Sequence, residues 1–159
     1  MGVSGSGKTT IGRLLSARLG IPFLDADDLH SAANVAKMAA GIPLTDADRG
    51  PWLTEVAERL AEARSEGRSL IVGCSALKRA YRDLLRDGDP PLRVIYLQGT
   101  HDELATRLAQ RVGHFFPPAL LVAQLADLEE PGPDERPIIV PIGGSPDEMV
   151  EKIAVALAG

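Results

Sequence analysis

Eight residues near the start of the chain restrict its fold more than any other segment. Residues Gly2 to Thr9 read G-x-x-x-x-G-K-T, a spacing that lets backbone N–H groups surround phosphate oxygens. Lys8 would reach the outer phosphates as a point charge, and the Thr9 hydroxyl would ligate Mg²⁺. Behind this loop, apolar residues recur at helical spacing, at Ile11, Leu14, Leu15 and Leu19. The pattern therefore predicts a phosphate-binding loop that opens onto a helix N-terminus.

Such a loop normally follows a buried strand, and in this sequence only Met1 precedes it. We therefore expect the first strand to be cut short, with part of it missing from the sequence. A fold of this type would otherwise lose its central strand.

Composition limits the classes of protein that fit. The 159 residues are expected to form one domain, 1–159, with a net charge of −5 that argues against nucleic-acid partners and anionic membranes. No apolar run approaches the ~20 residues of a membrane span. The single cysteine, Cys74, allows no intramolecular disulfide and fits a reducing cytoplasm. We therefore predict a cytoplasmic protein.

Apolar runs alternate with helical patterns along the rest of the chain. Expected strands cover residues 21–25, 70–74, 94–97 and 138–142, and most lack the polar alternation of a solvent-facing strand. Helices are expected over residues 27–40, 51–66, 77–86, 102–111, 119–128 and 146–158, with residues 42–50 as a loop. This order predicts a three-layer α/β/α fold whose parallel strands end along one edge, beside the phosphate loop.

Acidic residues follow the second expected strand and would lie near that edge. Among Asp25, Asp27 and Asp28, one carboxylate could hold Mg²⁺ through water and another could accept a proton from an attacking hydroxyl; Asp27 is the candidate for the second role, because it follows the strand close to the loop's edge. Asp27 or Asp28 would serve equally well as a helix N-cap, and spacing alone leaves both roles open.

Basic residues elsewhere offer sites for an anionic substrate. Arg49 would clamp a carboxylate with two hydrogen bonds, and Lys78 and Arg82 lie four residues apart on one helix face. Each of these side chains would also fit a solvated surface.

A second basic pair, Arg107 and Arg111, precedes an aromatic and proline-rich segment that begins at Gly113. Paired arginines beside such a segment suggest a lid over the phosphates, and a solvated helix face is the alternative.

Cys74 is expected to be a small buried residue, because no histidine is placed to activate it.

With these residues described, the sequence resembles the gluconokinases, the small P-loop kinases of gluconate, over essentially its whole length. The similarity lies in segments 1–8 (M-G-V-S-G-S-G-K), 23–30, 34–38, 41–53 (G-I-P-L-T-D-A-D-R-G-P-W-L), 74–86 (C-S-A-L-K-R-A-Y-R-D-L-L-R), 113–116 and 128–131. The phosphate loop alone is shared by many NTPases, whereas its combination with segments 41–53 and 74–86 is far more specific.

The resemblance implies ATP- and Mg²⁺-dependent phosphorylation of D-gluconate at its 6-hydroxyl by a cytoplasmic homodimer. It implies a five-stranded parallel sheet and a helical lid at approximately residues 107–131. Lys8 and Asp27 would be catalytic, and Thr9 and Asp25 would hold the metal. The nucleotide would contact Gly2, Val3, Ser4, Gly5, Ser6, Gly7, Lys8, Thr9, Thr10, Arg107 and Arg111. The substrate would contact Asp27, His30, Arg49, Ser75, Lys78, Arg82 and His114.

Two other functions compete with this one. Another small-molecule P-loop kinase, for shikimate or a nucleoside monophosphate, would share the loop and the fold. A GTPase switch would need a D-x-x-G segment and an N-K-x-D motif, and neither is present, since the only asparagine is Asn34.

Overall fold

The computed structural model describes residues 1–110 and 116–159, in which strands and helices alternate as expected. In chain order the elements are α1 (Lys8–Leu19), β1 (Phe23–Asp25), η1 (Ala26–Leu29), α2 (Ala32–Ala39), α3 (Asp46–Ser65), β2 (Ile71–Gly73), α4 (Arg79–Gly88), β3 (Ile95–Gln98), α5 (His101–Ala109), α6 (Pro118–Asp127), η2 (Pro133–Glu135), β4 (Ile138–Pro141) and α7 (Pro146–Ala158).

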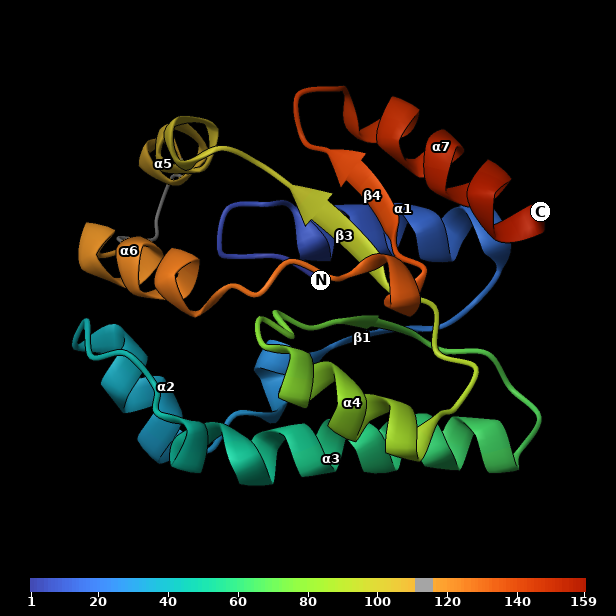
Figure 1. The fold of residues 1–159 in the computed structure, drawn as a ribbon, viewed down its shortest axis with the longest axis horizontal. Helices are drawn as coiled ribbons and strands as arrows, with labels where there is room; N and C mark the ends of the chain where they lie inside the picture. The colour runs from blue at the N-terminus through green and yellow to red at the C-terminus, as the bar shows by residue number, and fades with distance from the viewer. Residues whose placement is uncertain (111–115) are drawn as a thin grey trace.

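The strands lie between two layers of helices (Figure 1). Helix α1 packs against α7 and β2, and α7 also packs against β4, whereas α3 and α4 pack against each other on the opposite side. Two apolar cores result. One surrounds Leu15, Leu104 and Ile153, and the other surrounds Leu53 and Val56. The structure is thus an α/β fold with helices on both faces of the strands.

The predicted five-stranded sheet is not present in the described residues, where the strands form two separate parallel pairs. β1 pairs with β2 and β3 pairs with β4, each in parallel register. Met1 and Gly2 lie between the pairs: the Gly2 N–H donates to the Ser75 carbonyl, and the Leu97 N–H donates to the Met1 carbonyl. In the described residues the two pairs are thus linked here by backbone bonds of Met1 and Gly2, not by a strand.

Two expected boundaries were wrong because side-chain caps override the apolar pattern. Helix α3 begins at Asp46 within the expected loop, because Thr45 and Asp48 form a reciprocal capping box. The expected helix over residues 27–40 is divided, because Ser31 caps a new helix by accepting from the Asn34 N–H.

The observed caps at Thr100 and Ser145 agree with the expected helices there.

Among the described residues, no helix combines the length and the apolar character that crossing a membrane requires.

Candidate active site

The phosphate loop joins Met1 to helix α1 and has the backbone shape that its glycines predict. Gly5 and Gly7 adopt φ angles of 83° and 94°, which residues with a side chain rarely adopt. A Cβ atom on Gly5 would also lie 2.9 Å from Leu108 of α5. Helix α1 begins directly after Gly7, at Lys8, whose Nζ donates to the Val3 carbonyl at 3.2 Å. The loop therefore presents a helix N-terminus and a lysine, a combination that fits a phosphate group.

Thr9 and Asp25 are brought together although 16 residues separate them. The Thr9 hydroxyl donates to Asp25 Oδ2 at 2.6 Å, since the end of β1 lies beside the start of α1. Hydroxyl and carboxylate oxygens are the ligand types that Mg²⁺ prefers. This pair therefore has the chemistry expected of a magnesium site.

Asp27 follows on η1, and the N-cap of this turn is Asp25, not Asp27 or Asp28, the residues considered for that role. Asp25 caps the turn by accepting from the Asp27 N–H, which leaves the exposed Asp27 carboxylate beyond the end of β1. The His30 Nε2 atom lies 3.9 Å from that carboxylate.

His30 is held by aromatic stacking. Its ring lies 4.1 Å from the Trp52 ring, centroid to centroid, and the Trp52 indole N–H donates to the Ala26 carbonyl. Burial lowers the pKa of His30, and Arg49 lowers it further, against an opposing effect of Asp27. His30 is thus biased toward the neutral form beside Asp27.

Arg49 and Lys78 meet in one cluster of charges with Tyr81. Arg49 donates to the Asp127 carboxylate at 2.8 Å and to the Tyr81 hydroxyl at 3.1 Å. Lys78 Nζ lies 2.9 Å from Asp46 and 3.7 Å from Asp127. The two cations predicted to bind an anionic substrate therefore share a site, where carboxylates of the chain neutralise them.

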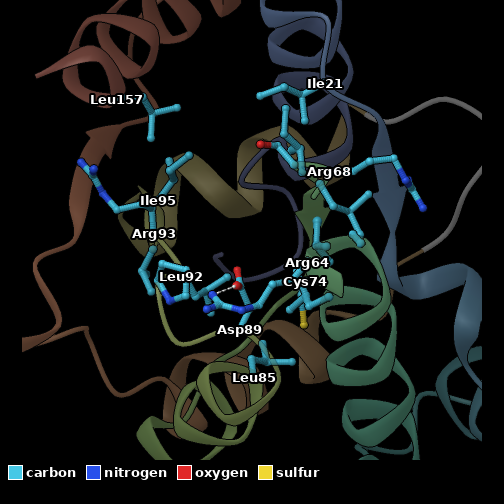
Figure 2. A pocket seen from close by; sticks show the side chains of 18 of the residues that line it. Ile21, Arg64, Arg68, Cys74, Leu85, Asp89, Leu92, Arg93, Ile95 and Leu157 are labelled. Atoms are coloured by element: carbon cyan, nitrogen blue, oxygen red, sulfur yellow. Dashed lines mark hydrogen bonds and ion pairs between the residues drawn. The ribbon is translucent and has the colours of Figure 1, made fainter. Parts of the chain in front are cut away.

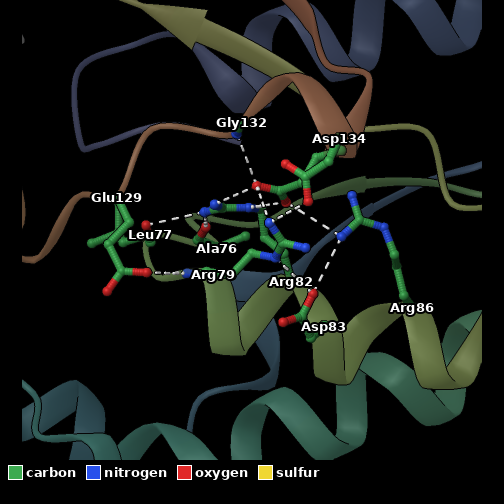
Figure 3. Close-up of polar contacts among 10 residues, drawn as sticks. Ala76, Leu77, Arg79, Arg82, Asp83, Arg86, Glu129, Gly132 and Asp134 are labelled. Atoms are coloured by element: carbon green, nitrogen blue, oxygen red, sulfur yellow. Dashed lines mark hydrogen bonds and ion pairs between the residues drawn. The ribbon is translucent and has the colours of Figure 1, made fainter.

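Arg82 pairs with a different carboxylate, that of Glu135, which does not fit the expected role in substrate binding (Figure 3). Its side chain is 2% exposed and forms a two-point ion pair with Glu135, at 2.6 and 2.9 Å. Its remaining bonds go to the carbonyls of Ala76 and Leu77. The contacts therefore give Arg82 a structural role, because all three of its nitrogens have partners within the chain.

Helix α6, inside the expected lid, contacts both halves of the site. The Gln124 side chain accepts from the Ser4 N–H at 2.7 Å, and Asp127 accepts from Arg49. Arg107 of α5 approaches Gly7 and donates to the Ile142 carbonyl. Arg111 and His114 lie outside the described residues, so their predicted roles stay predictions.

Two residues at the end of β2 complete the region. Burial raises the pKa of the Cys74 thiol to about 11, so the thiol stays protonated at neutral pH. Ser75 bonds to the phosphate loop through its carbonyl, which accepts from Gly2.

Sequence reasoning missed three residues that the structure adds to the region, Tyr81, Gln124 and Asp127, and it missed Glu135 as the partner of Arg82. Their partners lie 32 to 120 positions away, and no local pattern indicates such contacts.

The fold and this site define a P-loop kinase. The family model described as an AAA domain matches residues 1–131. The chain is 48% identical to a gluconokinase of Gluconobacter oxydans, covering 96% of this chain and 86% of that protein. It is 50% identical to the thermoresistant gluconokinase of Escherichia coli, covering 88% and 80%.

A crystal structure of a gluconokinase from Sinorhizobium meliloti superposes with a TM-score of 0.91 at 44% identity, over 99% of this chain and 89% of that one. This chain belongs to the gluconokinase family.

Proposed function

We infer that this chain is a gluconokinase, which transfers a phosphoryl group from ATP to D-gluconate and forms 6-phospho-D-gluconate. The observation that carries this conclusion is the 48–50% identity to gluconokinases over 88% or more of the chain. The geometry supports it, because helix α6 bonds both to the phosphate loop, through Gln124, and to Arg49, through Asp127.

ATP is proposed to place its phosphates against residues 2–10, where the loop backbone, Lys8 and Arg107 supply positive charge. Thr9 and Asp25 would hold Mg²⁺, which neutralises phosphate charge when it is bound.

D-gluconate is proposed to lie between Asp27 and the Arg49–Lys78 cluster. The Asp27 carboxylate is exposed at the end of β1 and would orient the 6-hydroxyl and accept its proton. Arg49 and Lys78 would bind the substrate carboxylate, and His30 would border the site. Arg82 is left out of this proposal because Glu135 already pairs with it. Ser75 stays a candidate contact.

Helix α6 is proposed to form part of the lid, at residues 107–131, because it bonds to the phosphate loop and to Arg49. A homodimer and a cytoplasmic location remain predictions from the family resemblance.

A substrate panel tests the proposed reaction. ATP turnover should be fastest with gluconate and very slow with glucose, which lacks the carboxylate and would leave the cations without a partner. Turnover that is faster with shikimate or a nucleoside monophosphate would favour the alternative kinase class.

A matched pair of variants tests the proposed role of Asp27. Asp27→Asn should lower kcat by roughly 10²–10⁴-fold, the usual effect of losing a general base, and should change the KM for ATP little. Asp28→Asn changes the neighbouring exposed carboxylate in the same way and should leave kcat nearly unchanged. Equal effects of the two substitutions would contradict the assignment.

A further inference from the structure

Helix α4 carries Lys78 at its N-terminal boundary, and the two ends of this helix have different environments. Farther along the helix, Leu85 faces an apolar cavity of about 520 Å³ (Figure 2). At the N-terminal end, Arg79 and Ala80 are exposed to solvent. Hydrogen bonds therefore fix the N-terminal end of α4 more than apolar packing does.

Lys78 occupies the N-cap position of α4 but cannot act as its cap. The first N–H groups of a helix need acceptors, and a lysine side chain has only donors. Its Nζ atom instead lies 2.9 Å from Asp46 and 3.7 Å from Asp127. An acceptor for the start of α4 must therefore come from another segment of the chain.

Glu129, two residues beyond the end of α6, supplies this acceptor (Figure 3). Its Oε2 atom accepts from the Arg79 N–H at 2.6 Å, and its own N–H donates to the Leu77 carbonyl at 2.9 Å. These two bonds hold the residues on either side of Lys78. The helix dipole also favours a carboxylate at this end of α4. Glu129 thus fixes the backbone from which the Lys78 side chain extends.

We propose that Glu129 is a positioning residue for substrate binding: it caps α4 in place of Lys78 and so holds the Lys78 ammonium in the Arg49–Lys78 cluster. This role rests on the proposed function, in which Lys78 binds the carboxylate of gluconate. Without the cap the first turn of α4 would fray, and a displacement of about 1 Å is enough to weaken a well-oriented contact severely. Glu129 acts through Lys78 and not by contact with the substrate.

Steady-state kinetics with three variants test this role. Glu129→Ala removes the acceptor and should raise the KM for gluconate about tenfold, with kcat changed less than about twofold. Glu129→Gln keeps an oxygen acceptor and should recover most of this loss. Glu130→Ala is the matched control, because the neighbouring carboxylate bonds to Tyr96 and Gln98 instead, so the KM should stay near the wild-type value.

A double-mutant cycle separates positioning from general destabilisation. Lys78→Ala alone should raise the KM for gluconate, and adding Glu129→Ala should raise it no further. The loss of Tm caused by Glu129→Ala should, by contrast, be about 2–4 °C in both backgrounds. Fully additive effects on the KM would overturn the proposed role, as would equal effects of Glu129→Ala and Glu129→Gln.

Amide exchange distinguishes a failure of this role from a failure of the proposed function. Glu129→Ala should speed exchange of the Arg79 N–H about tenfold, whether or not gluconate is the substrate. Unchanged exchange would overturn the cap. Faster exchange with an unchanged KM for gluconate would overturn the positioning role alone. A wild-type chain that is inactive with gluconate would instead overturn the proposed function.

Discussion

The buried carboxylate of Glu135 provides the sharpest test of how this structure is held together. It accepts two hydrogen bonds from Arg82, and a third from the Gly132 N–H at 3.1 Å. Its side chain is 1% exposed, and Arg86 lies 3.3 Å away (Figure 3). Glu135→Gln keeps the shape and removes the charge, so Arg82 would be left buried without an anion.

Two arguments give the expected loss of folding stability in Glu135→Gln. The hydrogen bonds from Arg82 are the main cause that lowers the pKa of Glu135 from 4.5 to about 2. At ~1.4 kcal/mol per pKa unit, this shift corresponds to about 3 kcal/mol of stability at neutral pH. Removing one partner of a buried ion pair typically costs about 3–5 kcal/mol. We therefore expect Glu135→Gln to destabilise by about 3 kcal/mol, or to lower Tm by roughly 6–12 °C.

The pH dependence distinguishes the ion pair from general packing. Because the folded-state pKa of Glu135 is depressed, its stabilisation is complete above pH 4.5 and is lost as the pH falls toward about 2. Thermal unfolding of the wild type and Glu135→Gln should therefore converge over this range.

Asp134→Asn is the matched control for this experiment. The Asp134 carboxylate pairs with Arg79 at 2.8 Å, but its side chain is 63% exposed, so its loss should change Tm little. The reasoning would be refuted if Glu135→Gln lowered Tm no more than Asp134→Asn, or if its effect stayed constant down to pH 2. Replacing Arg82 and Glu135 together with apolar residues should recover part of the loss.

Further predictions concern the candidate active site. Lys8→Ala should abolish turnover and leave the circular dichroism spectrum unchanged; full activity in the folded variant would exclude the phosphate-loop mechanism. Asp127→Asn should lower the KM for gluconate, because this carboxylate competes for Arg49; a raised KM in steady-state kinetics would instead indicate that Asp127 helps to close the site. Trp52 fluorescence should change with pH as the stacked His30 titrates, with a midpoint below 6.5, and His30→Gln should abolish the change. The pKa of His30 is lower in the folded state than in the unfolded state. The free energy of unfolding, measured with urea, should therefore carry the full contribution of His30 above pH 6.5 and decrease as the pH falls below it.

Local patterns predicted well those parts of the site that depend on neighbouring residues in sequence. The phosphate loop could be identified because its glycines need positive φ angles and its lysine begins a helix. The closeness of Thr9 and Asp25 was also predictable, because parallel strands end at the same edge as the loop.

The sequence by itself determined the phosphate loop, the alternation of strands and helices, and the residue types available for the chemistry. The tertiary structure alone decided how the charges are paired. Lys78 and Arg82 look equivalent on one helix face, yet Lys78 reaches Asp46 and Arg82 is buried against Glu135. The carboxylates that separate their roles come from distant segments. Which carboxylate meets which cation depends on the packing of whole elements, and no spacing along the chain encodes that packing.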